Sequence, residues 1–378
     1  MNYNLDDVQI SGIRRFFNKV KEVPGAISLT LGQPDFAMPK EIKLGMIKAI
    51  EEDKTIYTDN LGVPELREEV SIYLKSKNIN YSKEEICITV GGSEGLFSAI
   101  ASVINKEDKL LIPTPGYPAY ENIVKILGGV VVYYKLNEDF TINIEELESL
   151  IVKDDIKYMI LSYPSNPTGA ILNYKDYCTL VDLIKKYNLL VITDEVYEAF
   201  SYEEYYSIAM NEEIKENIIY VGSFSKMFSA TGIRLGFIAT NYKVIDEITK
   251  VHQYCVSCAN SIAQFGVIEG LKSGLYNIDI MKKEFILRKE YVEKRLKVMN
   301  LDFISPKGAF YIFPSIKRFN ITSEEFCLRL LKEKKVACVP GDAFGYGGEG
   351  YIRISYCYSI EELKEALDSI ELFIKEIN

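Results

Sequence analysis

A short stretch from Ser223 to Gly236 carries the side chains with the most distinctive chemistry. It reads Ser-Phe-Ser-Lys-Met-Phe-Ser-Ala-Thr-Gly-Ile-Arg-Leu-Gly. The hydroxyls of Ser223 and Ser225 and the guanidinium of Arg234 are donors that suit a phosphate dianion. Lys226 stands among apolar neighbours, and an amine that loses part of its hydration attacks carbonyls more readily. The combination predicts a Schiff-base lysine beside a cofactor that carries an aldehyde and a phosphate.

Asp194 is a second position with chemical potential. It follows the apolar run Leu189–Thr193, which predicts a buried strand, and it opens the sequence Asp-Glu-Val-Tyr197. A carboxylate at a buried strand end costs several kcal/mol unless it meets a cation. A protonated pyridine nitrogen is such a cation. Capping of the next helix is the other reading of Asp194.

A possible anion site lies earlier in the chain. Residues 85–90 alternate like a strand, Gly91-Gly-Ser-Glu94 follows, and a helix is expected from Gly95 to Ile104. The free N–H groups and the dipole of a helix N-terminus favour an anion. Backbone groups of Gly92, Ser93 and Glu94 are the candidates, with the Glu94 side chain pointing away.

The other elements that must position these residues follow from hydrophobic periodicity. Strands are expected over 110–113, 156–162, 218–221, 233–240, 303–313, 336–340 and 351–355. Helices are expected over 6–21, 244–253, 261–271, 276–299, 323–334 and 360–377. Candidate residues fall mainly after strands, where open α/β sheets place their ligands.

Ser-x-Ser-Lys followed by Gly-x-Arg-x-Gly resembles the cofactor-attachment segment of the class I and II aminotransferases, which are fold-type I pyridoxal-phosphate enzymes. Other motifs match in the same order, including Gly32-Gln-Pro-Asp-Phe36, Ser165-Asn-Pro-Thr-Gly169 and Tyr351-Ile-Arg-Ile-Ser355. The resemblance spans residues 32–353. It implies an α/β fold with a mostly parallel large-domain sheet flanked by helices, plus a smaller α+β domain.

The resemblance also implies a role for each matched residue. Lys226 carries pyridoxal 5'-phosphate and moves protons, while Asp194 faces the ring nitrogen. Asn166 and Tyr197 bind the ring oxygen, and Tyr117 stacks on the ring. The cofactor phosphate would be bound by Ser223, Ser225, Arg234, the Gly92–Glu94 backbone and Tyr57 of a neighbouring subunit. The substrate would be bound by Gly32, Asn166 and Arg353.

Chain length and the implied role of Tyr57 determine the expected organisation. A chain of 378 residues suits two domains. The large cofactor-binding domain is expected over 39–274, and the small one combines 1–38 with 275–378. Because Tyr57 would serve the neighbouring subunit, a homodimer with active sites at the interface is expected.

Composition restricts the partners and the compartment. The net charge of −10 argues against nucleic acid or an acidic membrane surface as a partner. No apolar run approaches a membrane span, and the first residues do not resemble a signal peptide. Seven scattered cysteines suggest reduced thiols in the cytoplasm.

The chain has a single histidine, His252, so a Ser-His-Asp mechanism is improbable unless His252 is its base. His252, Cys255 and Cys258 fall three apart, yet a fourth zinc ligand is missing from the pattern. Packing or local hydrogen bonding is the expected role of these three residues. No metal site is expected.

The substrate is less well defined by the sequence. Residues 10–14, 250–258 and 308–316 resemble the bacterial N-acetyl-diaminopimelate aminotransferases of lysine biosynthesis, which implies glutamate as amino donor. Aspartate, aromatic and alanine aminotransferases share the catalytic set, and Arg14 or Arg15 is a candidate for the distal substrate group. A fold-type I β-lyase or decarboxylase is an alternative. A cofactor-binding regulatory module is the non-enzyme alternative, although the sequence lacks a basic DNA-binding extension.

Overall fold

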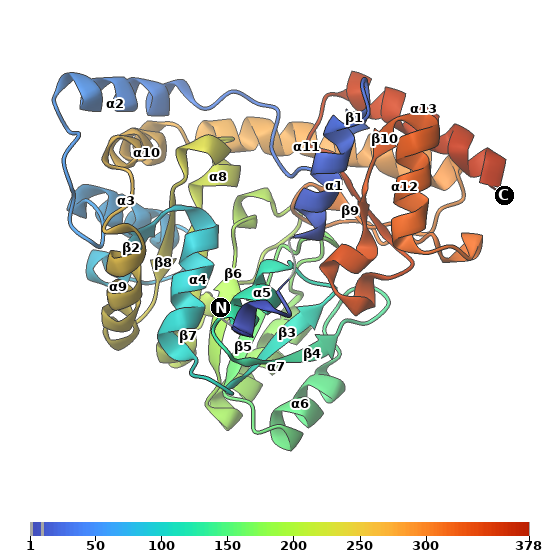
Figure 1. Ribbon diagram of the computed structural model, residues 1–378. Helices are drawn as coiled ribbons and strands as arrows, with labels where there is room; N and C mark the ends of the chain where they lie inside the picture. The colour runs from blue at the N-terminus through green and yellow to red at the C-terminus, as the bar shows by residue number, and fades with distance from the viewer. Residues whose placement is uncertain (1–2, 9–10, 378) are drawn as a thin grey trace.

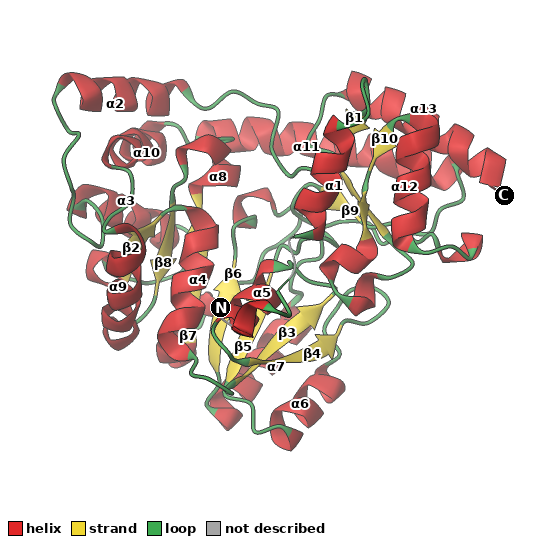
Figure 2. Ribbon diagram, in the orientation of Figure 1, coloured by secondary structure: helices red, strands yellow, loops and turns green. Residues whose placement is uncertain are grey.

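The computed structural model describes residues 3–8 and 11–377, without the side chains of Tyr3 and Arg14. A seven-stranded sheet in the order β2-β8-β7-β6-β5-β3-β4 forms its centre (Figures 1 and 2). β8 runs antiparallel to both neighbours, and the other pairings are parallel. The strands are β2 (Ile86–Thr89), β3 (Lys109–Thr114), β4 (Val130–Lys135), β5 (Tyr158–Ser162), β6 (Leu190–Asp194), β7 (Ile218–Ser223) and β8 (Gly236–Ala239).

Helices cover this sheet, which explains the composition of its strands. All six residues of β7 and all four of β8 are buried, as expected for strands covered on both faces. Figure 2 shows the helices around the strands. They include α4 (Gly91–Val103), α5 (Ala119–Ile126), α6 (Ile144–Lys153), α7 (Tyr174–Tyr187) and α9 (Tyr242–Val256). The expected α/β fold with a mostly parallel sheet is confirmed.

The two ends of the chain build a second group of elements. β1 (Ile27–Ser28) pairs in parallel with β10 (Val336–Ala337), and β12 (Ile352–Ser355) lies between β11 (Val339–Pro340) and β9 (Tyr311–Ile312). Lys19 of α1 (Gly12–Lys21) lies 3.8 Å from Glu324 of α12 (Ser323–Lys334), and α13 (Ile360–Ile377) packs against α12 in the same part of Figure 1. After β1 the chain leaves this group and leads across to the next helix, at the upper left of Figure 1.

Two long contacts fix the path of that segment. α2 (Lys40–Glu51) packs closely on α10 (Ser261–Ser273), where a Cβ on Gly266 would lie 2.4 Å from Met46 Cγ. Asp35 forms a two-pronged ion pair with the buried Arg288 of α11 (Tyr276–Val298), at 2.7 and 3.0 Å. The remaining helices are α3 (Pro64–Lys75) and the short α8 (Phe224–Met227).

Several element boundaries differ from the sequence expectation. The strand expected from residue 233 begins at Gly236, because Arg234 adopts a left-handed φ of 54°. α4 begins at Gly91 rather than Gly95, despite the low helix propensity of glycine. A Cβ on Gly95 would lie 3.3 Å from Val221 Cγ1, so close packing on the sheet favours glycine there.

Two further expectations were wrong. The N-terminal helix begins at Gly12 rather than Asp6, since residues 6–7 form a turn. The stretch 303–313 contains only the two-residue strand β9. Over residues 3–8 and 11–377, none of the helices combines the length and apolarity that a bilayer span requires.

Candidate active site

Three parallel strands end side by side and define the site. The register pairs Ser162 of β5 with Asp194 of β6, and Asp194 with Val221 of β7. Asn166 follows the end of β5, Tyr197 follows the end of β6, and Lys226 follows the end of β7. The carboxyl edge of the sheet therefore positions these predicted residues, which is where α/β sheets bind ligands.

Lys226 lies one turn after β7, on α8. Ser223 begins this helix as its N-cap, and its Oγ accepts a hydrogen bond from Ser225 N at 3.2 Å. The Lys226 Nζ donates to the carbonyl oxygen of Gly32 at 2.7 Å. Gly32 leaves no room for a side chain, because a Cβ there would lie 1.6 Å from the Tyr311 hydroxyl. The amine is thus held against the N-terminal segment.

Asp194 is buried, with 5% of its surface exposed. Its Oδ2 accepts a hydrogen bond from the Tyr120 hydroxyl at 2.6 Å, and its Oδ1 accepts one from Val196 N at 3.3 Å. Burial raises the pKa of the Asp194 carboxyl to about 6, and the two hydrogen bonds oppose this increase. A nearby cation would further stabilise the ionised form, so this position suits a protonated ring nitrogen.

Sequence reasoning missed Tyr120. The residue follows Tyr117 by three positions at the start of α5, and the two rings pack edge to face with centroids 5.7 Å apart. Tyr117 precedes α5 whereas Tyr120 lies in its first turn, so helical spacing does not link them and the sequence held no local signal for Tyr120. The first tyrosine was recognised and the second was not.

Arg353 is a buried guanidinium on β12, with 1% of its surface exposed. Its Nη1 donates to Asn166 Oδ1 at 2.8 Å, and its Nη2 donates to the carbonyl oxygen of Thr30. Its Nε is buried without a hydrogen-bond partner in the described chain. The guanidinium lies over the Tyr311 ring, 4.4 Å from the centroid. A planar cation with a spare donor suits an incoming carboxylate.

Tyr311 also joins Tyr197, and sequence reasoning missed this residue as well. The two hydroxyl oxygens lie 2.7 Å apart. Burial raises the pKa of Tyr197, so its hydroxyl stays protonated and available as a donor at neutral pH. Tyr311 therefore contacts Gly32, Arg353 and Tyr197 at once.

The first turn of α4 lies against the predicted phosphate ligands. Its N-cap residue is Val90, which offers no side-chain cap to the first N–H groups. A Cβ on Gly92 would lie 3.5 Å from Ser223 Cβ, and one on Gly91 would lie 2.5 Å from Arg234 Nη2. The Ser225 Oγ is buried without a hydrogen-bond partner among the described residues. The side chains of Ser223 and Arg234 therefore both lie against the first two residues of α4.

The Glu94 carboxylate has other partners than Ser223 and Arg234, in agreement with the sequence analysis. Its Oε2 accepts a hydrogen bond from Val90 N at 2.9 Å. Its Oε1 accepts one from Ser98 Oγ at 2.5 Å and lies 3.2 Å from His252 Nδ1. Ser93, by contrast, is exposed. His252 thus forms a local hydrogen bond, whereas Cys255 is exposed and Cys258 is half-buried.

Some predicted positions lie at the surface. Tyr57 is 86% exposed. Arg234 is exposed and donates to the carbonyl oxygen of Thr231 at 2.9 Å. Arg15 is exposed on α1, and the side chain of Arg14 lies outside the described residues. Tyr57 and Arg15 therefore do not join the buried cluster within this chain.

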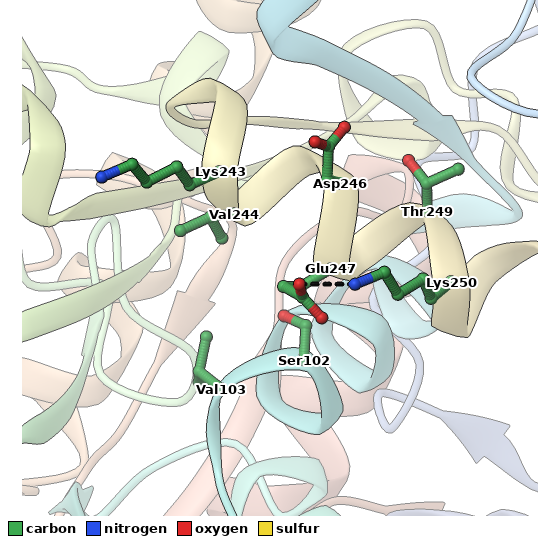
Figure 3. Close-up of a pocket in the computed structure, with 8 residues that line it drawn as sticks. All are labelled: Ser102, Val103, Lys243, Val244, Asp246, Glu247, Thr249 and Lys250. Atoms are coloured by element: carbon green, nitrogen blue, oxygen red, sulfur yellow. Dashed lines mark hydrogen bonds and ion pairs between the residues drawn. The ribbon is translucent and has the colours of Figure 1, made fainter.

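A separate surface hollow lies between the end of α4 and the start of α9 (Figure 3). An ion pair between Glu247 and Lys250, at 2.6 Å, lies in it. None of the predicted catalytic or cofactor-binding residues lines this hollow. Its lining residues are Ser102, Val103, Lys243, Val244, Asp246, Glu247, Thr249 and Lys250.

Comparisons with known proteins agree with this geometry. Residues 24–370 match the model of the family described as aminotransferase class I and II. A probable N-acetyl-LL-diaminopimelate aminotransferase of Bacillus subtilis is 40% identical over 99% of this chain and 95% of that protein. An aspartate aminotransferase of Pyrococcus abyssi is 38% identical over 100% of this chain and 98% of that protein.

A solved structure extends the likeness to three dimensions. The aromatic aminotransferase from Pyrococcus horikoshii has a TM-score of 0.90 and 38% identity, covering 96% of this chain and 99% of that one. The chain therefore belongs to the class I and II aminotransferases, the fold-type I enzymes that use pyridoxal phosphate. The family resemblance found in the sequence is confirmed.

Proposed function

We propose that this aminotransferase exchanges the amino group of glutamate with the 2-oxo counterpart of N-acetyl-LL-diaminopimelate, in amino-acid biosynthesis. The supporting relative is the Bacillus subtilis protein, which is 40% identical over 99% of this chain. The Pyrococcus abyssi relative makes aspartate the second candidate substrate. The acetylated substrate is the more specific hypothesis.

One observation carries the amino-acid chemistry. Arg353 donates to the carbonyl oxygen of Thr30, and Lys226 donates to that of Gly32, two residues further along the same segment. The segment thus holds a carboxylate-binding cation and a reactive amine close to each other. An amino acid carries its carboxylate and its amino group on one carbon. A substrate whose carboxylate binds Arg353 therefore presents its Cα toward the Lys226 amine.

The residues present fit pyridoxal 5'-phosphate. The phosphate would be bound by the hydroxyls of Ser223 and Ser225, by Arg234 and by the Gly92–Glu94 backbone. The Ser225 hydroxyl is buried and has no partner within residues 3–8 and 11–377. Asp194 would face the ring nitrogen, Asn166 and Tyr197 the ring oxygen, and Tyr117 one ring face. When bound, the cofactor supplies an aldehyde for the amine and a ring that accepts an electron pair.

Lys226 then performs the chemistry that belongs to the protein. Its amine holds the cofactor until a substrate amine displaces it. The released amine would act as general base and then general acid, taking the proton from the substrate Cα and giving it to the cofactor carbon that carried the aldehyde. Arg353 keeps the Cα in place during both transfers, because its guanidinium can grip a carboxylate with two parallel hydrogen bonds.

The same proposal includes a homodimer in the cytoplasm. Tyr57 is exposed here, as expected if it serves the phosphate of a neighbouring subunit. All seven cysteines are free thiols, which supports a reducing compartment. The domain division at 39–274, with 1–38 and 275–378 forming the small domain, is part of this proposal.

The test is a substrate screen with purified protein and its Lys226→Ala variant. We expect 2-oxoglutarate-dependent turnover of N-acetyl-LL-diaminopimelate at a kcat/KM above that of aspartate, phenylalanine and alanine. Lys226→Ala should lose the yellow cofactor absorption and at least about 10⁴-fold in kcat, because it removes both the nucleophile and the general base.

Each alternative has a distinct result. A higher kcat/KM with aspartate or an aromatic amino acid would replace the proposed substrate. Release of pyruvate and ammonia without an amino acceptor would identify a β-lyase. Full activity in Lys226→Ala would reject the catalytic assignment.

A further inference from the structure

The only histidine of the chain is buried in a place that the proposed chemistry does not use. His252 lies on α9 with 0% of its surface exposed. Its Nδ1 is 3.2 Å from Glu94 Oε1, and its Nε2 has no partner among the described residues. The tautomer with the proton on Nδ1 therefore donates to Glu94 and leaves no buried donor unpaired. α9 is thereby tied to the first turn of α4.

The Glu94 carboxylate is fixed by three donors from three sides. Ser98 Oγ and His252 Nδ1 reach Oε1, at 2.5 and 3.2 Å, and Val90 N reaches Oε2 at 2.9 Å. Burial opposes ionisation of Glu94, but the hydrogen bonds from His252, Ser98 and Val90 together lower its pKa below 4.5. The carboxylate is therefore charged and held in a single orientation.

That orientation matters because Glu94 stands in the first turn of the helix assigned to the phosphate. A carboxylate turned toward the first-turn N–H groups of α4 would repel a phosphate and compete for its donors. The Glu94 carboxylate is instead bound to Val90 N, Ser98 and His252, while Ser223 and Arg234 lie against Gly92 and Gly91 of the same turn. The Ser225 hydroxyl, buried without a hydrogen-bond partner among the described residues, lies in the short helix that Ser223 caps.

We propose that His252 and Glu94 are positioning residues for cofactor phosphate: His252 holds the Glu94 carboxylate away from the anion and fixes the first turn of α4. The inference rests on the proposed function, because it deepens the phosphate subsite assigned there. It makes His252 act through Glu94 on phosphate binding, without contact to substrate or cofactor. Its effect should therefore be confined to ligands that carry a phosphate.

The test compares ligands with and without a phosphate on the full-length protein. Calorimetric titrations use pyridoxal 5'-phosphate, pyridoxal and inorganic phosphate. In His252→Phe, which keeps a ring but removes the donor, we expect about tenfold weaker binding of both phosphate-bearing ligands. Binding of pyridoxal should stay within about twofold of wild type. His252→Asn, whose amide nitrogen replaces Nδ1, should restore most of the affinity.

Thr249→Val is the matched control, because the Thr249 hydroxyl bonds only within α9, to Ile245 O at 2.7 Å. It should bind all three ligands as wild type does. Unchanged phosphate binding in His252→Phe, or an equal loss of pyridoxal binding, would overturn the inference. Wild-type protein that binds no pyridoxal 5'-phosphate would instead overturn the proposed function.

If circular dichroism shows that His252→Phe does not fold, a milder variant tests the same positioning role. Ser98→Ala removes another donor to the same Glu94 oxygen. We expect about threefold weaker binding of pyridoxal 5'-phosphate and unchanged binding of pyridoxal. Wild-type affinity in folded Ser98→Ala would then overturn the positioning role.

Discussion

Two adjacent buried carboxyl groups at the end of β6 have different surroundings. Asp194 meets Tyr120 and a backbone N–H, with a pKa raised by burial to about 6. Glu195 accepts from Thr193 and Ser207, at 2.8 and 2.5 Å, and from Tyr205. Burial raises the pKa of Glu195 to about 8. Burial therefore disfavours the ionised form of Glu195 more than that of Asp194, and Asp194 is the carboxylate that better suits a cationic ring nitrogen.

Tyr120→Phe should weaken this arrangement. The variant removes the 2.6 Å hydrogen bond that stabilises ionised Asp194, so the pKa of that carboxyl should increase further. If activity requires the ionised form, the acidic limb of the kcat/KM profile should move up by about one pH unit. Loss of rate should be about fivefold at pH 6 and close to none at pH 8. Steady-state assays across this range measure the shift.

Tyr134→Phe is the matched control for this prediction. The Tyr134 hydroxyl is equally buried and donates to Ile160 O at 2.9 Å, away from Asp194. This variant should lose about 1 kcal/mol of stability and keep the wild-type pH profile. Identical profiles for the two variants would show that Tyr120 does not act on Asp194.

The sequence predicted single residues best where a local motif carried them. Lys226, Asp194 and Asn166 follow neighbouring strand ends, as their motifs indicated, and their catalytic roles stay predictions. Tyr120 and Tyr311 were missed because tyrosine is common here, with 27 in the chain, and neither stands in a distinctive pattern. Their partners lie 74 and 114 positions away, so only folding brings them together.

At the scale of elements, glycines set how closely α4 approaches β7 and β8. A Cβ on Gly236 would lie 2.8 Å from Gly222 O, 2.8 Å from Gly91 C and 2.9 Å from Gly92 N. All three are backbone atoms, which cannot move aside as a side-chain end can. The glycine that closes the Gly-x-Arg-x-Gly motif is therefore a packing requirement for the phosphate-side turn.

Gly236→Ala should consequently separate the first turn of α4 from the sheet edge. We expect a loss of stability on the order of 1–3 kcal/mol, as for other overpacked sites, and about tenfold weaker binding of pyridoxal 5'-phosphate. Gly232→Ala is the control, since a Cβ there meets nothing within 4 Å. Thermal unfolding and ligand titration measure both effects. Equal behaviour of the two variants would contradict the packing argument.

Element type was predictable from periodicity in most of the segments assigned, but not over 303–313, and element ends were predicted less well. The apolar run from Ile233 continues the pattern of β8, but the left-handed Arg234 interrupts it. The start of α4 at Gly91 was not predicted, because glycine has a low helix propensity. The residues that pack against Gly91 and Gly92 are also distant in sequence. The starts of β8 and α4 depend on tertiary contacts, which a local sequence pattern does not contain.

At the scale of the whole molecule, exposed apolar side chains lie on α2 and on the loop after it that carries Tyr57. Ile56 is 76% exposed, and Leu44, Ile47 and Ile50 of α2 are each about half exposed. Apolar side chains grouped on one helix and the loop that follows it favour contact with another protein. A second copy of this chain is the occupant that the proposed role of Tyr57 requires. The dimer stays a prediction, and its catalytic consequence can be measured.

Mixed dimers test whether Tyr57 serves the site of the other subunit. Lys226→Ala and Tyr57→Ala homodimers should each have low activity at limiting pyridoxal 5'-phosphate, because every site lacks one group. A hybrid dimer contains one site with both wild-type residues, so random reassortment of equal amounts should restore about a quarter of wild-type activity. Tyr242→Ala, another exposed tyrosine, should remain active by itself. No recovery in the mixture, with hybrids verified by mass, would mean that Tyr57 does not complete the neighbouring site.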